Sequence, residues 1–163
     1  EQPTWAALCA RWPIFVSYLL SFFYVGVYWG NHHHLVHTVR RVDGKLLWLN
    51  LHLLFWMSHI PFVTAWLGES QLAPLPTFSY GVVMLLAGIA YLFLQLVIAA
   101  QQTDERHRRA HRRQQWKGYV ALFCYATGLP LAWTGHVYVA MALFLGIALA
   151  WAMPERGLAD AAD

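Results

Sequence analysis

Charged residues are scarce in this chain: they make up 12% of its 163 residues, whereas 59% are hydrophobic and 16% are aromatic. A soluble domain carries roughly a quarter charged residues, because its surface must be covered by groups that water solvates. The few charges present also cluster in short stretches. The composition therefore excludes an ordinary soluble domain and predicts an integral membrane protein.

Cysteine is nearly absent as well. Cys9 and Cys124 are far apart in or near apolar segments, which favours two buried thiols over a disulfide. Neither a Cys-x-x-Cys nor a Cys-x-x-Cys-His motif occurs, so no thiol-bound metal and no c-type haem is indicated. No cleavable signal peptide is visible. For the chain as a whole we predict no cofactor, no metal site and no catalytic residue, and the histidines are weighed separately below.

Long apolar runs are what the chain has instead. Five of them approach the ~20 residues that a helix needs to cross a bilayer. The predicted helices cover residues 13–37, 46–67, 78–100, 119–134 and 137–153. The predicted fold class is all-α, a polytopic transmembrane bundle in one domain over 1–155, followed by a short cytoplasmic tail at 156–163. Thr134-Gly135-His136 leaves almost no loop, so the last two helices should form a tight hairpin.

The basic residues predict the orientation of these helices. They gather in segments 38–45 and 101–117 and at Arg156, all on one side in an up-down threading, and Arg11 alone is on the other side. The positive-inside rule makes both basic segments and the C-terminus cytoplasmic. The first visible helix then starts outside. An external start without an export signal favours a further helix before Glu1, which gives a six-span subunit.

Polar side chains follow one face of the predicted helix 13–37. The spacing i, i+4, i+7 puts them on a single stripe, and its members are Ser17, Ser21, Tyr24, Tyr28 and Asn31. The stripe indicates either a hydrophilic face beside an ion path or a face that packs against neighbouring helices.

Small residues predict close helix packing in two places. Gly26 and Gly30 form a Gly-x-x-x-Gly pair on the opposite face of helix 13–37, and Gly81 and Gly88 mark a small-residue face of helix 78–100. Such residues let helix backbones approach closely in membranes. Gln95, on the same face as the second pair, predicts a hydrogen bond to a neighbouring helix.

The basic segment 104–113 contains no glycine or proline and can continue as helix. Basic side chains near a membrane surface gain about 1 kcal/mol each from anionic headgroups. The residues predicted to contact lipid headgroups are Arg106, Arg108, Arg109, Arg112, Arg113 and Lys117. Membrane attachment disfavours the alternative of nucleic-acid binding.

The histidines allow two enzyme interpretations. His33/His37 and His107/His111 are i, i+4 pairs of the kind that di-iron desaturases use, since imidazole suits iron. The chain has no His-x-x-His-His box, and arginines surround the second pair. A b-type haem protein is another option, with His52 or His59 and His136 as ligands.

The favoured interpretation makes the polar groups near the end of helix 13–37 structural. They would form a buried network that ties helices together, comprising Asn31, His32, His33, Asp43 and Asn50. Hydrogen bonds inside membranes average only ~0.6 kcal/mol, but leaving such groups unpaired costs more than that. The network would therefore specify which helices pack together more than it would add stability.

Four sequence blocks resemble a known family. They are Tyr28-Trp29-x-Asn31-His32-His33-x-Leu35, then Arg41-Val42-Asp43-Gly44-Lys45-Leu46-Leu47-Trp48-Leu49-Asn50, then Pro61-Phe62-x-Thr64 and Gly68-Glu69. The chain thereby resembles the prokaryotic branch of the transmembrane protein 175 family, the lysosomal potassium channels of animals and their bacterial relatives. The resemblance implies a homotetramer of six-helix subunits in the bacterial plasma membrane, permeable to potassium ions without a TVGYG-type filter.

In that family the first helix lines the pore and carries an Arg-x-x-x-Phe-Ser-Asp signature, which this sequence lacks. The resemblance thus implies that the visible helices form a scaffold around a pore-lining helix missing from the chain. The residues expected to receive the signature are Asn31, His32, His33, Asp43, Trp48 and Asn50. The alternatives are a histidine-rich membrane metalloenzyme, with di-iron or b-haem, and a non-conducting helical scaffold.

Overall fold

The computed structural model describes residues 4, 5, 9, 11–103 and 105–153, and gives only the backbone for 13, 14, 16, 17, 20 and 105–110. Five long helices make up the described part. They are α2 (Trp12–His37), α3 (Gly44–Glu69), α4 (Pro74–Ala100), α5 (Glu105–Trp133) and α6 (Val137–Ala152). The predicted all-α fold class is confirmed for these residues. The tail at 156–163 lies outside them.

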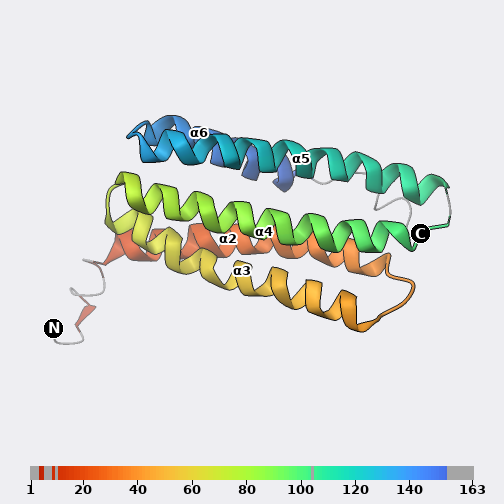
Figure 1. Cartoon of the computed structure of the whole chain (residues 1–163). Helices are drawn as coiled ribbons and strands as arrows, with labels where there is room; N and C mark the ends of the chain where they lie inside the picture. Colours follow the sequence, from red (N-terminus) through yellow and green to blue (C-terminus); the bar gives the residue numbers. More distant parts are fainter. Residues whose placement is uncertain (1–3, 6–8, 10, 104, 154–163) are drawn as a thin grey trace.

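Consecutive helices run in alternating directions and pack side by side (Figure 1). The central helix is α4, which packs extensively against both α3 and α5. The helix α2 packs mainly against α3 and touches α4 and α6 along shorter stretches. The connections α2–α3 and α4–α5 lie together at one end of the bundle, and the turns α3–α4 and α5–α6 lie at the other (Figure 1). The two basic segments therefore share one end.

Local sequence explains where several helices begin. Asp43 caps α3, because its carboxylate accepts a hydrogen bond of 2.8 Å from the backbone N–H of Leu46. Pro74 occupies the first turn of α4, where a missing N–H has no consequence. The helix α5 begins at Glu105 instead of 119, since nothing in the basic segment interrupts helical hydrogen bonding.

Two turns at the far end use the same backbone motif with different residues. At the end of α5, His136 N–H donates to the Leu131 carbonyl at 2.8 Å, and the αL position between the helices is Gly135, with φ 89°. This is a Schellman ending, which favours glycine. At the end of α3 the corresponding positive φ of 50° falls on Gln71. A side chain with a Cβ is strained in this left-handed conformation.

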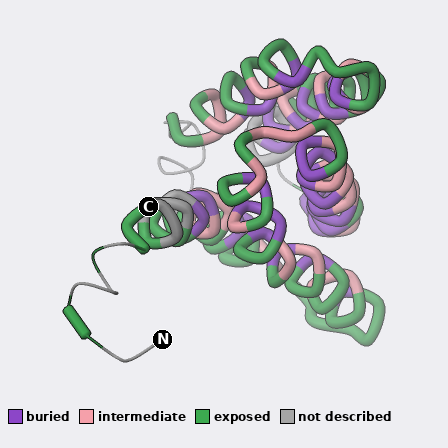
Figure 2. Tube along the Cα trace, turned by 90° about the vertical axis from the view of Figure 1, so that its left-hand side faces the viewer, coloured by how far each residue is buried: buried purple, intermediate pink, exposed green. Residues whose placement is uncertain are grey.

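Buried residues concentrate where the helices meet, and each helix keeps an exposed side (Figure 2). Phe144 of α6 is fully buried against Tyr80 and Tyr125, at the centre of the α4–α5–α6 contact. Large apolar side chains cover much of the outside, among them Phe22 at 68% exposed and Phe123 at 73%. Such an outer surface suits lipid better than water.

Within the described residues, α3 and α4 are each long and apolar enough to cross a membrane, with mean hydropathy of 1.4 and 2.5 in their most apolar windows. The helix α6 is apolar but has 16 residues. The architecture is a helical membrane bundle in which α3 and α4 are the clearest spans. Membrane crossing by α2, α5 and α6 stays a prediction.

Candidate functional site

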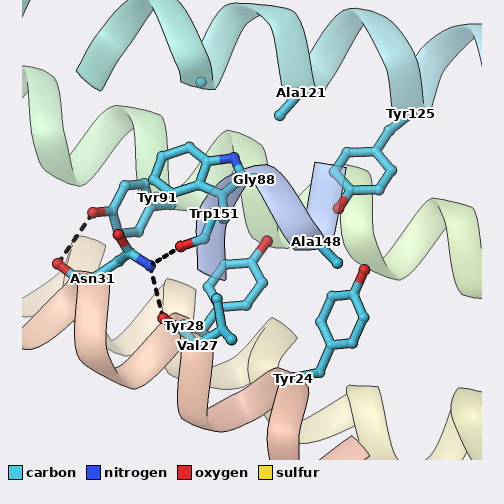
Figure 3. A pocket seen from close by; sticks show the side chains of 11 residues that line it. Tyr24, Val27, Tyr28, Asn31, Gly88, Tyr91, Ala121, Tyr125, Ala148 and Trp151 are labelled. Atoms are coloured by element: carbon cyan, nitrogen blue, oxygen red, sulfur yellow. Dashed lines mark hydrogen bonds between the residues drawn. The ribbon is translucent and has the colours of Figure 1, made fainter. Parts of the chain in front are cut away.

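A small cavity lies inside the bundle between α2, α4, α5 and α6 (Figure 3). Its volume is ≈ 40 Å³, which leaves room for a few water molecules, since one needs at least ~10–15 Å³. Its lining includes Asn31, Trp151 and four tyrosines, which are Tyr24, Tyr28, Tyr91 and Tyr125. From Ser21 to Asn31 the polar stripe of α2 therefore faces protein, because Ser21 and Tyr24 are buried and Tyr28 and Asn31 line this cavity.

Hydrogen bonds around the cavity join α2 to α6 and α4. The side-chain N–H of Asn31 donates to the carbonyl of Trp151 at 3.2 Å, and the hydroxyl of Tyr91 donates to the backbone carbonyl of Asn31 at 3.2 Å (Figure 3). The hydroxyl of Tyr24 donates to the carbonyl of Phe144 at 3.1 Å. Tyrosines thus anchor α2 to the other helices through backbone oxygens.

A buried amide pair continues this network between α4 and α5. Gln95 Nε2 donates to Gln114 Oε1 at 3.0 Å, which confirms the hydrogen bond predicted for Gln95. Gln114 Nε2 in turn donates to the Tyr91 hydroxyl at 3.2 Å. Three helices are therefore linked by one chain of bonds from Gln95 to Asn31. Buried polar chains of this kind specify one arrangement of helices.

The end of α4 holds the α2–α3 connection in place. Gln101 Oε1 accepts from the backbone N–H groups of Arg40 and Arg41, both at 3.1 Å, and its Nε2 donates to the Arg41 carbonyl at 3.0 Å. Gln102 Nε2 donates to the Thr38 carbonyl at 2.6 Å. These four bonds fix both basic segments at the same end of the molecule.

The outer face of α2 is left open. The residues of this face are all exposed, and they are spaced alternately four and three positions apart. They are Phe15, Leu19, Phe22, Gly26, Trp29 and His33. A Cβ placed on Gly26 or Gly30 would meet no described atom within 4 Å. The described chain therefore makes no close helix contact at this pair.

Comparison with known proteins identifies the kind of chain to which this site belongs. A family model described as endosomal/lysosomal potassium channel TMEM175 matches residues 1–61. A potassium channel of Chryseobacterium sp. (strain P1-3) is 37% identical over 156 residues, which cover 96% of this chain and 81% of the relative. The chain belongs to the TMEM175 family.

Two further relatives of this TMEM175 family member carry similar names. A potassium channel of Streptomyces collinus is 43% identical over 65 residues, or 40% of this chain and 32% of the relative. A potassium channel of Chamaesiphon minutus is 26% identical over 143 residues, or 87% of this chain and 70% of the relative. No solved structure gives a significant match. The resemblance stated from the four sequence blocks is confirmed.

The six residues predicted to receive a pore-helix signature have different surroundings in this TMEM175 chain. His32 and Asn50 are brought together, with Nε2 2.6 Å from Oδ1, and join α2 to α3. Asn31 lies on the cavity side, where its side-chain N–H donates to the Trp151 carbonyl. Asp43 caps α3, and Trp48 is 73% exposed on its outer side. His33 is exposed and pairs with His37.

Close helix packing is predicted at four glycines, and the structure shows it at two of them. A Cβ on Gly81 would lie 2.7 Å from Phe144, and one on Gly88 would lie 3.0 Å from Leu122, so both glycines sit in close helix contacts. Gly26 and Gly30 do not, within the described chain. The tightest contact, Gly128 against Phe144, was missed by sequence reasoning, although a glycine in the middle of an apolar helix is a packing signal.

The predicted headgroup residues are described in part. Arg112 and Arg113 are exposed and Lys117 is half-buried on α5. The side chains of Arg106, Arg108 and Arg109 lie outside the described residues. Headgroup contact remains a prediction for all six basic residues.

The histidines proposed as enzyme ligands have other contacts. His52 accepts from the indole N–H of Trp56 at 3.3 Å, and His59 lies 2.8 Å from the Phe55 carbonyl on the same helix. His136 lies beside Thr134 in the α5–α6 turn. In the part of the chain that the structure describes, no three histidine, cysteine or acidic side chains gather as a metal site. The geometry gives no support to a di-iron centre.

Proposed function

We propose that this chain is a subunit of a potassium-permeable cation channel. The observation that carries the proposal is its 37% identity, over 96% of its length, to a protein named a potassium channel. Two further relatives with the same designation support it. The permeant ion is potassium, and the chain has no catalytic role.

The proposed channel works without a TVGYG-type filter. That pentapeptide does not occur in the sequence, and carbonyl filters of potassium channels are built from it. The described helices act instead as a scaffold around a separate pore-lining helix. The open face of α2 supports this arrangement, because a helix needs an apolar surface with small residues for close approach, and Gly26 and Gly30 leave that space.

We further propose that the subunit assembles as a homotetramer in the bacterial plasma membrane. The basic end of the bundle faces the cytoplasm, where anionic lipids attract Arg112, Arg113 and their neighbours. The proximity of both basic segments at one end supports this orientation. The polar groups Asn31, His32, His33, Asp43, Trp48 and Asn50 remain the proposed receivers of a pore-helix signature.

The direct test is potassium flux into liposomes that contain the full-length protein. We expect uptake above that of empty vesicles, and flux equal to that of empty vesicles would contradict the channel.

A matched pair of variants tests the scaffold arrangement. Gly26→Leu fills the open face of α2, whereas Gly146→Leu fills an equally empty position on α6, since neither glycine has a described atom within 4 Å of an added Cβ. We expect Gly26→Leu to reduce flux strongly in protein that remains folded and monodisperse, and Gly146→Leu to conduct normally. Equal flux from the two variants would contradict the placement of the pore helix on α2.

A further inference from the structure

The last turns of α2 hold two histidines whose ring nitrogens nearly meet. Nε2 of His33 lies 3.1 Å from Nε2 of His37, although the ring centroids are 4.4 Å apart. The rings therefore turn their Nε2 ends toward each other. Both side chains are exposed, and the i, i+4 spacing keeps them on one face of the helix.

We propose that His33 and His37 form a two-imidazole site for a divalent transition-metal ion of the class of Zn²⁺, Ni²⁺ or Cu²⁺, with water in the remaining positions. Imidazole is a preferred ligand of these ions. With metal–nitrogen bonds of about 2.0–2.1 Å, a separation of 3.1 Å between the two nitrogens corresponds to an angle of roughly 95–102° at the metal. That angle lies between octahedral and tetrahedral geometry, so the helix already sets the spacing that both geometries accept.

Metal binding needs only a local change in the two rings. In the bond between the neutral rings, one Nε2 carries the hydrogen and the other accepts it. Each ring binds a metal through Nε2 when its hydrogen is on Nδ1, so one ring changes tautomer by proton exchange with water. Rotation of both side chains away from the line between the two nitrogens then directs the two lone pairs to one ion.

The charges around His33 and His37 have opposing effects on cation binding. His37 is the last residue of α2, and the C-terminal end of a helix carries partial negative charge that favours a cation. Arg40 and Arg41 follow in the connection and oppose cation binding, although Arg40 Nη1 is held 2.6 Å from Thr103 Oγ1. With two protein ligands and these opposing charges, the site suits a reversible regulatory ion better than a permanent structural one.

The other histidines do not reproduce this arrangement in the described chain. His107/His111 has the same spacing, but His111 is 1% exposed and the side chain of His107 lies outside the described residues. His34 is exposed next to the pair, and its ring centroid is 5.9 Å from that of His33. Its position makes His34 the matched control for the experiment.

The test is titration of the full chain, purified in detergent with a histidine-free tag, with NiCl₂ or ZnCl₂ in a calorimeter. We expect the wild type to bind one metal ion per chain and to melt at a higher temperature with metal. His33→Ala and His37→Ala should each weaken binding at least ~10-fold and remove the shift in melting temperature. His34→Ala should bind like the wild type.

Three outcomes would overturn the proposal: no saturable binding to the wild type, wild-type affinity in both single variants, or an equal loss in His34→Ala. Because all three side chains are exposed, the variants are expected to fold, and circular dichroism before titration verifies this. The readout does not depend on ion conduction, so failure of the channel proposal would leave it standing. The two proposals give His33 different partners, and saturable binding that is lost in His33→Ala would remove His33 from the proposed receivers of the pore-helix signature.

Discussion

The two sides of this bundle use the same kinds of residue to different effect. Around α4, α5 and α6, glycines lie against aromatic rings, amides bond to one another, and Phe144 is completely buried. Along the outer face of α2, glycines face open space and phenylalanines are exposed. The first side is a finished helix contact, whereas the second has the composition of a contact without a described partner. Composition alone therefore does not determine which surface is a core.

The largest effect should come from removing the centre of the finished side. Phe144→Ala deletes a fully buried ring and should lower the free energy of unfolding by about 3–5 kcal/mol, because the cavity left behind cannot close completely. Phe22→Ala removes a ring that is 68% exposed and should cost far less. Denaturation in mixed micelles, followed by circular dichroism, measures both. Equal losses would mean that the face of α2 is as well covered as the core.

A glycine pair sharpens the comparison. A Cβ on Gly128 would lie 2.8 Å from Phe144 Cζ, and the enclosed ring has little space to move, so Gly128→Ala should destabilise by about 1–3 kcal/mol. Gly26→Ala adds a methyl group to open space and should be neutral or stabilising by up to ~1 kcal/mol, since alanine is the better helix former. The same unfolding assay compares them. A neutral Gly128→Ala would show that the α5–α6 contact is looser than described.

Much of the fold could be predicted from the sequence, because each apolar run is long enough to be one helix and the connections are short. Helix ends were harder to place. Hydropathy places the start of the last-but-one helix at 119, because it reports where a helix meets lipid, whereas the absence of glycine and proline from 104–113 predicts the helical continuation that begins at Glu105. The polar pattern predicts Asp43 in a buried network, whereas its place just before a helical run is also an N-cap signal, and the structure shows that cap.

The candidate site was less predictable, because it depends on which faces meet. Gly26 and Gly81 belong to similar small-residue patterns, yet only Gly81 has a neighbour in close contact within the described chain. The link from Gln114 to Tyr91 joins positions 23 apart in sequence through hydroxyl and amide groups. Periodicity places such residues on a face of one helix but does not name the partner helix.

The amide chain of the finished side offers a third test. Gln114→Leu leaves Gln95 Nε2 and the Tyr91 hydroxyl without the bonds that Gln114 makes, and this should cost about 1–3 kcal/mol. Gln115→Leu changes the neighbouring, half-buried amide and should have little effect. The difference between the two unfolding free energies is the quantity to measure. If Gln115→Leu is the more harmful, the network does not stabilise the α4–α5 contact.

The smallest effect belongs to the polar contact between α2 and α3. A double-mutant cycle of His32→Ala and Asn50→Ala isolates the bond between Nε2 and Oδ1, which are 2.6 Å apart. We expect a coupling of about 0.6 kcal/mol, the average for side-chain hydrogen bonds in membranes. A coupling above ~1.7 kcal/mol would exceed the largest values measured for such bonds in membranes and would mean that this bond is a principal anchor of α2. A value near zero would leave α2 held chiefly by its tyrosine anchors, and so free to adjust when another helix covers its open face.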